Sequence, residues 1–242
     1  MAMKTNGKSI PKYVLLRRHH ILSMRLLGVL LCVIGMLLVG KGGYMQAKAQ
    51  LAQFLIAHAW QKTLQDNQPH KPWEWADTYP VAKLSLLPKS DYRPVAAGGT
   101  AEQRENGATE QDAAENSLYV LAGATGRSLA FGPGLVLGGA DAGKVGNTII
   151  AGHRDTHFAI LNGVTVGRYL QLETSQGDII TYRVSQTHIV PATDTRFMTR
   201  TTDERLTLIT CYPFEGLAGG AELRFVVEAI PIVDHLPQIA SI

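Results

Sequence analysis

The longest apolar run of the chain lies near its N-terminus and predicts a membrane-spanning helix. Residues Leu26–Gly40 carry no charge, and extending the run back to Ile21 gives roughly 20 residues at the expense of including Arg25. Six Lys or Arg residues precede the uncharged core and two follow it before residue 49. This bias predicts a cytoplasmic basic tail over residues 1–20 and a signal anchor over residues 21–43.

A cleaved signal peptide is the alternative interpretation of this run. Ala47–Ala49 (AKA) resembles a cleavage site, but it lies nine residues past the apolar core. The sequence that begins at Tyr44 also continues in a helical pattern, which is unfavourable for cleavage. We therefore favour an uncleaved anchor, and both interpretations place the rest of the chain outside the cytoplasm.

A second helical pattern follows the anchor. Between Tyr44 and Leu64, apolar residues recur every three or four positions, which predicts an amphipathic helix. This helix would either pack on the following domain or rest at the membrane surface. Two prolines in the sequence DNQPHKP end the pattern. Residues 44–70 are therefore predicted as a juxtamembrane helix and linker.

Short strand-like runs dominate the remainder of the chain and predict a mostly β domain over residues 71–242. The runs are rich in Val, Ile, Thr, Leu and Tyr, and Gly, Pro, Asp and Asn separate them, as in a sandwich or barrel. Thr174–Asp178 has the composition of a hairpin turn. Thr125–Gly132 predicts a short helix with Thr125 as its N-cap. The predicted strands are Val81–Leu87, Ser117–Ala122, Thr148–Gly152, Tyr169–Glu173, Asp178–Val190, Arg205–Cys211 and Ala221–Pro231.

Residues 96–117 differ from the rest of this domain. They contain no Val, Ile, Leu or aromatic residue, so they cannot bury enough apolar surface to order themselves. Because strand-like runs continue on both sides, we predict a flexible insertion within the domain.

The charge of the chain is unevenly distributed. The net charge of +3 arises from residues 1–48, which carry eight Lys or Arg residues and no acidic residue. The other residues carry 15 Lys or Arg against 20 Asp or Glu, a net charge of −5. The predicted domain therefore has no basic stripe, and the sequence argues against nucleic-acid binding.

Cys211 is the only cysteine outside the apolar run, because Cys32 lies within that run. A lone thiol in an oxidising compartment is a liability unless it is buried or used. A small buried hydrophobic residue is one interpretation. A nucleophile is the other, and it requires a histidine, because only about 3% of an ordinary thiol is ionised at pH 7. It also requires a donor for the developing oxyanion.

His153 is the strongest candidate for the base, because it follows a buried-type strand and a glycine that lets the backbone turn. His157 would substitute if the segment between the two histidines turns back. His188 lies within a strand and is more typical of a sheet face. The two histidines four residues apart lack a third ligand at a recognisable spacing, so no metal site is expected.

Arg224 is the candidate oxyanion donor. It lies 13 residues after Cys211, so two neighbouring strands would bring the guanidinium beside the thiol. Its fixed fork of N–H groups reaches a carbonyl oxygen without titrating. In the alternative interpretation, Arg224 and Glu222 form a surface ion pair of little energetic value.

Four segments together resemble the sortase family. Thr207–Cys211 (TLITC) fits the T-L-x-T-C signature of sortases, and Ala151–Phe158 (AGHRDTHF) resembles the region around the sortase catalytic histidine. Arg224 falls on the strand after the cysteine, where sortases carry their arginine. Ala124–Gly134 (ATGRSLAFGPG) is similar to the sortase segment upstream of the histidine. The resemblance covers Trp73–Ile230.

The entry into the domain resembles one class of this family. Lys71–Leu84 (KPWEWADTYPVAKL) and the long N-terminal helix are similar to the class GN sortases of Gram-negative proteobacteria. This resemblance implies an inner-membrane protein with a cytoplasmic N-terminus and a periplasmic catalytic domain.

The family resemblance implies an eight-stranded sortase β-barrel with short helices and the activity of a cysteine transpeptidase. Cys211 would attack the Thr–Gly bond of an LPxTG-like C-terminal sorting signal and form a thioester. His153 would protonate the leaving amine and then deprotonate an incoming amine nucleophile. Arg224 would hold the substrate and stabilise the oxyanion, with help from the backbone at Thr210. No cofactor is implied.

Residues 193–204 precede the cysteine strand, where sortases often line the substrate groove. Arg196, Phe197 and Met198 are therefore candidate groove contacts, although surface packing would explain any one of them. Two alternatives to transpeptidation remain open. One is a cysteine peptidase that transfers to water only, and the other is a non-catalytic membrane-anchored binding module with a buried, structural Cys211.

Overall fold

The computed structural model of the chain describes residues 12–87, 117–215 and 221–232, with side chains from residue 25 onward. Most of the predicted tail and nearly all of the predicted insertion (96–117) lie outside the described residues. The chain divides into two compact units, Met1–Leu51 and Ala52–Ile242.

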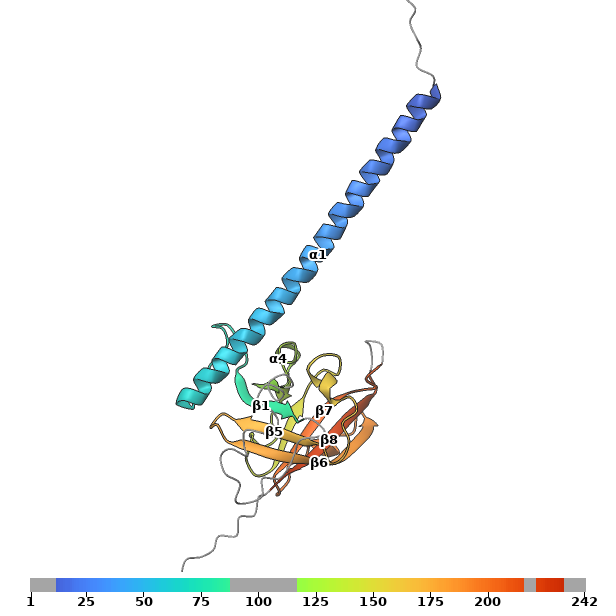
Figure 1. Cartoon of the computed structure of the whole chain (residues 1–242). Helices are drawn as coiled ribbons and strands as arrows, with labels where there is room; N and C mark the ends of the chain where they lie inside the picture. The colour runs from blue at the N-terminus through green and yellow to red at the C-terminus, as the bar shows by residue number, and fades with distance from the viewer. Residues whose placement is uncertain (1–11, 88–116, 216–220, 233–242) are drawn as a thin grey trace, which may run out of the picture. The chain divides into compact units, whose positions relative to one another are not determined.

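A single helix, α1 (Lys12–Asp66), extends over 55 residues (Figure 1). The predicted anchor and the predicted juxtamembrane helix are therefore continuous. Among the described residues, one helix is long and apolar enough to cross a membrane, as judged by length and composition. The helix ends where Asn67 adopts a left-handed backbone conformation with φ 58°, and the Asp66 carboxylate accepts a hydrogen bond from the Gln68 N–H.

The last four turns of α1 belong to the second unit and pack on it. The Trp60 ring is fully buried, and its centroid lies 6.5 Å from that of Tyr119. Gln53 Nε2 donates to the carbonyl of Phe131 at 2.7 Å. Of the two roles predicted for the amphipathic helix, the structure shows packing on the domain. The buried residues recur at helical spacing: Ala52, Ile56, Ala59, Trp60 and Thr63.

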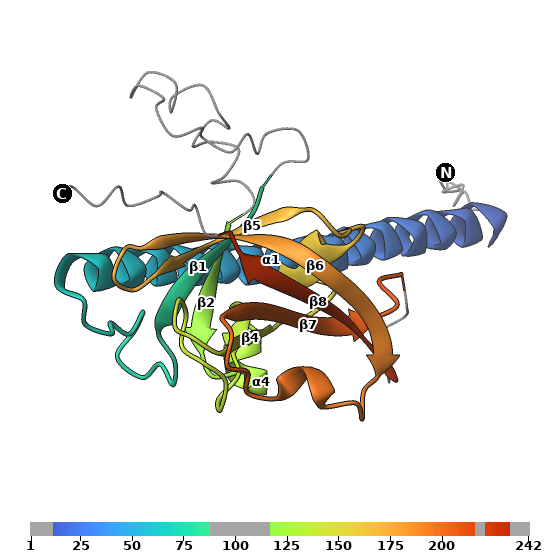
Figure 2. The same cartoon turned by 90° about the horizontal axis from the view of Figure 1, so that it is seen from below.

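Eight strands close into a barrel, which confirms the predicted fold (Figure 2). The strand order around the barrel is β1-β2-β3-β4-β7-β8-β6-β5. The β2–β3 and β4–β7 pairs are parallel, and the others are antiparallel. The strands are β1 (Pro80–Leu86), β2 (Ser117–Ala122), β3 (Gly134–Leu135), β4 (Asn147–Ala151), β5 (Tyr169–Thr174), β6 (Ile179–Pro191), β7 (Arg205–Tyr212) and β8 (Leu223–Pro231).

Within the described residues, three short helices connect these strands: α4 (Gly126–Leu129), η1 (His157–Leu161) and η2 (Arg196–Met198). Thr125 is the N-cap of α4, as predicted, and its hydroxyl accepts a hydrogen bond from the Ser128 N–H. The Ser128 hydroxyl in turn accepts from the Thr125 N–H, which completes a capping box.

The barrel core forms on the inward face of β7 and β8. Leu206 and Leu208 of β7 point into the barrel, opposite Ala229 and Val227 of β8, and all four are fully buried. Because side chains alternate between faces along a strand, the intervening residues of both strands point outward. The outward face of β4, β7, β8 and β6 carries the candidate site.

Candidate active site

Adjacent parallel strands bring His153 and Cys211 to the same end of the barrel. Ala151, the last residue of β4, pairs with Ile209 of β7. One residue further, the Gly152 N–H donates to the Ile209 carbonyl at 3.1 Å. His153 therefore follows the point where β4 leaves the sheet, and Cys211 lies on the neighbouring strand at the same level. His153 is exposed.

Arg224 lies directly opposite Cys211 in the antiparallel β7–β8 pair. Such partners share a face of the sheet, with Cβ atoms about 4.5–5.5 Å apart. The preceding pair joins Thr210 to Phe225, whose ring belongs to the inward core. Cys211 and Arg224 therefore face outward together. Cys211 is half-buried and has no disulfide partner, so its thiol is not sealed within the core.

Backbone carbonyls hold the Arg224 side chain near the start of β8. Its Nη1 donates to the carbonyls of Ala221 at 2.7 Å and Leu223 at 3.0 Å. Arg224 and Glu222, which are both described, form no ion pair with each other. The surface-pair interpretation of Arg224 is therefore not supported by the structure.

The segment after His153 turns back, as the alternative for His157 required. The His153 carbonyl accepts hydrogen bonds from the N–H groups of Thr156 at 3.4 Å and Phe158 at 3.0 Å. His157 then begins η1 and is half-buried. Burial lowers the pKa of His157, and the charge of nearby His153 lowers it further.

Gly152 is required by close packing. A Cβ atom at this position would lie 2.7 Å from the ring of Phe158, which is fully buried. The turn after His153 brings this ring over the glycine. From the sequence, Gly152 was expected to let the backbone turn. Its backbone does not adopt a positive φ, so the close approach of the Phe158 ring is the reason for the glycine.

The two threonines of the TLITC segment both bind the β4 segment. The buried hydroxyl of Thr210 donates to the Gly152 carbonyl at 2.8 Å. The buried hydroxyl of Thr207 donates to Asn147 Oδ1 at 2.7 Å. These bonds fix the register of β7 against β4 at both ends, and that register places Cys211 at the level of His153.

Asn147 also holds η2 against the barrel. Its Nδ2 group donates to the carbonyls of Phe197 at 2.9 Å and Thr199 at 3.1 Å. The Phe197 ring lies against His188 on β6, with centroids 4.7 Å apart. His188 pairs with Val226, two residues along β8 from Arg224. The η2 segment therefore lies on the same outward face as Cys211 and Arg224.

The other two candidate groove residues differ in their contacts. Arg196 forms a two-pronged ion pair with Asp194, and this hydrogen bonding lowers the pKa of the Asp194 carboxyl. Its guanidinium carbon also lies 5.6 Å from the centre of the Phe197 ring. Met198 is partly exposed, with 43% of its surface accessible. Met198 is thus open to an incoming chain, whereas the Arg196 head group is already engaged.

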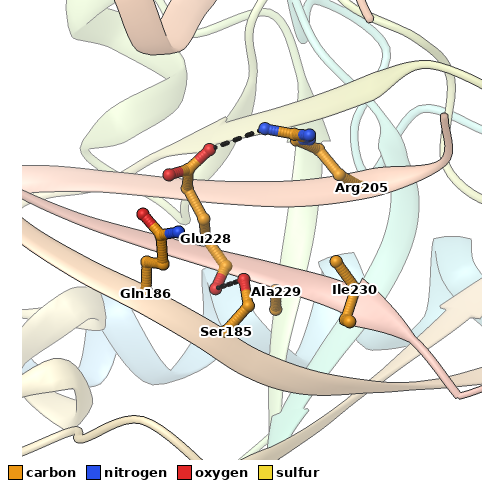
Figure 3. A pocket seen from close by; sticks show the side chains of 6 residues that line it. All are labelled: Ser185, Gln186, Arg205, Glu228, Ala229 and Ile230. Carbon is orange, nitrogen blue, oxygen red and sulfur yellow. Dashed lines mark hydrogen bonds and ion pairs between the residues drawn. The ribbon is translucent and has the colours of Figure 1, made fainter. Parts of the chain in front are cut away.

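A chain of charges continues along the outward face beyond η2. Glu228 bonds His188 Nε2 at 3.0 Å and Arg205 Nη1 at 2.9 Å. Beside it lies a pocket of about 200 Å³, where the Ser185 hydroxyl donates to the Glu228 carbonyl at 3.0 Å (Figure 3). This pocket contains none of the three predicted catalytic residues. Its lining consists of Ser185, Gln186, Arg205, Glu228, Ala229 and Ile230.

Two residues that support the site were not singled out from the sequence. Asn147 begins a buried strand, where a polar residue must be bonded, and this was the available signal. Arg154 directly follows His153 and is buried, with 6% of its surface exposed. No sequence signal distinguishes Arg154 from a surface arginine.

Comparison with known proteins identifies relatives of one family. A family model described as a sortase domain matches residues 111–232, which is half of the 242 residues. Sortase D of Bacillus subtilis (strain 168) is 37% identical over 83 residues. That match covers 34% of this chain and 41% of the relative, so the chain spans about two fifths of the length of this curated protein.

Solved structures of two further sortases are similar to the chain. Sortase A from Corynebacterium diphtheriae is 21% identical with a TM-score of 0.47, over 65% of this chain and 63% of that one. The Sortase D5 transpeptidase of Clostridium perfringens is 20% identical with a TM-score of 0.47, over 73% of this chain and 88% of that one.

Proposed function

Because this chain belongs to the sortase family of cysteine transpeptidases, we propose that it cleaves an LPxTG-like C-terminal sorting signal between Thr and Gly. The released protein would be transferred to an amine nucleophile. One observation carries this proposal: Cys211 on β7 lies between two neighbouring strands that supply the other two residues. Arg224 on β8 is its direct partner, and His153 follows the end of β4 on the other side. Nucleophile, base and oxyanion donor are the three groups that acyl transfer through a thiol requires.

In the proposed first step, the Cys211 thiolate attacks the carbonyl carbon of the threonine. The oxyanion accepts hydrogen bonds from the Arg224 guanidinium, and the His153 imidazolium donates its proton to the leaving glycine amine. The C–N bond breaks and a thioester remains. In the second step, the incoming amine attacks the thioester carbonyl, His153 accepts its proton, and the Cys211 thiolate leaves. The pair is thereby restored.

The substrate would lie on the outward face beside η2. Phe197 and Met198 are proposed groove contacts, because this segment borders the strands that carry Cys211 and Arg224. Arg196 would contribute its aliphatic stem, since Asp194 engages its head group. Thr210 would act through its backbone, because its hydroxyl is bonded to Gly152.

We expect Asn147→Asp to weaken substrate binding. The variant keeps the acceptor for Thr207 but loses both donors that hold η2, and its carboxylate would face two carbonyls. The KM should rise several-fold with little change in kcat, while the free energy of unfolding falls by about 1–3 kcal/mol. Steady-state kinetics and urea denaturation measure the two effects.

Thr207→Val is the matched control for this prediction. It removes a bond to the same asparagine but leaves the bonds to Phe197 and Thr199 intact. It should destabilise the protein without changing the KM. If both variants raised the KM equally, loss of stability would explain the effect, and η2 would have no separate role in the groove.

We expect Arg224→Met to lower kcat/KM by about 10²–10³-fold, the usual loss when an oxyanion donor is removed. Methionine retains much of the length of the side chain but has no N–H group. Arg224→Lys should recover only part of the activity, since a lysine lacks the fixed fork. Glu222→Gln, which lies two residues before Arg224 and just outside β8, is the control and should resemble the wild type. A loss below about threefold in Arg224→Met would remove Arg224 from the mechanism.

We further propose that residues 21–43 anchor the protein in the inner membrane, with a periplasmic catalytic domain (71–242), and that it is a class GN sortase of a Gram-negative bacterium. The apolar composition of α1 supports the anchor, and the excess of six cations before the apolar core over two after it supports the orientation. The KPWEWADTYPVAKL segment supports the class. We retain residues 44–70 as the juxtamembrane region, although part of its helix packs on the barrel.

The test of the proposed function uses the full chain in detergent micelles. The protein is incubated with an LPxTG-type peptide and an amine acceptor, and the products are identified by mass spectrometry. Cleavage after threonine with the amine joined supports transpeptidation. Cleavage that yields only the free acid, across a panel of amine acceptors, indicates a cysteine peptidase. No cleavage, combined with a Cys211 thiol that resists iodoacetamide, supports the binding module.

A further inference from the structure

Arg154 is a buried cation immediately beside the proposed catalytic base. Its side chain is only 5% exposed. A buried guanidinium is costly unless its N–H groups are bonded. Nη1 donates to the carbonyl of Pro213 at 2.7 Å, and Nε donates to Asp155 Oδ1 at 3.2 Å. The shorter of these bonds spans 59 residues of sequence.

The Pro213 bond joins the two halves of the proposed site. Pro213 lies two residues after Cys211, and Arg154 lies one residue after His153. The ladder between β4 and β7 ends with the bonds that involve Gly152. The Arg154–Pro213 bond therefore continues the connection between these segments past His153, where no strand pairing holds them.

The acceptor of this bond lies between two residues that pack on the barrel. The residues on either side of Pro213 are aromatic and pack with Phe225 of β8. The ring centroid of Tyr212 lies 6.4 Å from that of Phe225, and that of Phe214 lies 5.5 Å from it. Both rings pack against the barrel core. A bond to the Pro213 carbonyl therefore ties the turn after β4 to a segment that packs on the barrel core.

We propose that Arg154 is a positioning residue that sets the separation between the His153 imidazole and the Cys211 thiol. This inference rests on the proposed function. Arg154 acts through the Pro213 carbonyl and does not touch the substrate. Arginine suits the role because its charge is permanent and its fork donates in two directions at once, which a lysine cannot reproduce. A shift of about 1 Å in such a pair is enough to cost about 10²-fold in rate.

The test compares Arg154→Met with the wild type, both as full-length protein in detergent and in a Cys32→Ser background. With Cys211 as the only thiol, its alkylation by iodoacetamide is followed as a function of pH, and kcat and KM are measured for peptide transfer. We expect the alkylation profile of Arg154→Met to move toward that of His153→Ala. We also expect kcat to fall about 10²-fold with a nearly unchanged KM.

Two further variants separate positioning from stability. Asp155→Asn removes the exposed ion pair but keeps the Pro213 bond, so it should match the wild type in both assays. Arg154→Lys retains the buried charge and should fold even if Arg154→Met does not. It should restore part of kcat because one donor still reaches toward Pro213. If Arg154→Met or, where it does not fold, Arg154→Lys melts at a lower temperature but keeps the wild-type alkylation profile and kcat, the inference is overturned.

The alkylation assay needs no sorting peptide, so it distinguishes failure of this inference from failure of the proposed function. If His153→Ala changes the alkylation profile and Arg154→Met does not, only the role of Arg154 is wrong. If His153→Ala leaves the profile unchanged and no peptide is transferred, both proposals fail together, because Arg154 is argued to act through His153.

Discussion

Replacing Cys211 with alanine is expected to abolish peptide transfer, with a loss of at least about 10³-fold in kcat, because Cys211 is the nucleophile proposed to form the acyl intermediate. The side chain faces outward and is half-buried, so the substitution removes one sulfur without opening a cavity in the barrel core. The melting temperature should change little. Single-turnover assays that trap the thioester by mass spectrometry measure the effect directly.

Cys32→Ser is the matched control, because it removes the only other thiol of the chain. It should transfer peptide at the wild-type rate. Cys211→Ser retains the size and polarity of the side chain but offers a far weaker nucleophile at neutral pH, so it should be nearly as inactive as the alanine variant. Residual transfer above about a tenth of the wild-type rate in Cys211→Ala would assign the nucleophile to another residue.

The barrel strands were predictable because each carries its own signal. All seven strands predicted from apolar runs are present, with ends that shift by at most two residues. The Thr125 cap was also predictable, because a threonine before a helical turn can accept a hydrogen bond from a free N–H group of that turn. The strand β3 was missed since it has only two residues, too few for any periodicity. The family resemblance supplied the total of eight.

The extent of α1 shows where a local pattern is insufficient. Spacing alone indicated an amphipathic helix but left its partner open between membrane and domain. The structure supplies the partner, since Trp60 is buried against Tyr119 and Gln53 bonds Phe131. The residues that a helix packs against depend on tertiary contacts between positions tens of residues apart. A local sequence pattern does not include both partners of such a contact.

The sequence pointed to candidate site residues but not to how they are arranged. The sequence separates Cys211 from Arg224 by 13 residues, a distance that a single strand connection can span, and their pairing followed from this. His153 is 58 residues from Cys211, and its adjacency depends on the parallel pairing of β4 with β7. That pairing is a property of barrel topology. The roles of Arg154 and Asn147 could not be predicted from the sequence, because both side chains bind backbone carbonyls that are distant in the chain.

His153→Ala is expected to reduce kcat by about 10²–10⁴-fold, the range for removal of a general acid–base group. His157→Ala should cost less than about tenfold. His153 is exposed and follows the point where β4 leaves its neighbour β7. His157 lies within the turned-back segment and is half-buried. Both variants are assayed in single-turnover acylation across pH 5 to 9.

The pKa of His157 gives the physical reason for this order. Burial and the charge of His153 both lower it, so His157 stays neutral down to a lower pH than an ordinary histidine. A neutral imidazole cannot donate a proton to the leaving amine, which the first step requires. A larger loss in His157→Ala than in His153→Ala would exchange the proposed roles of the two histidines. His157, at the start of η1, would then be the acid–base group, and His153 would not.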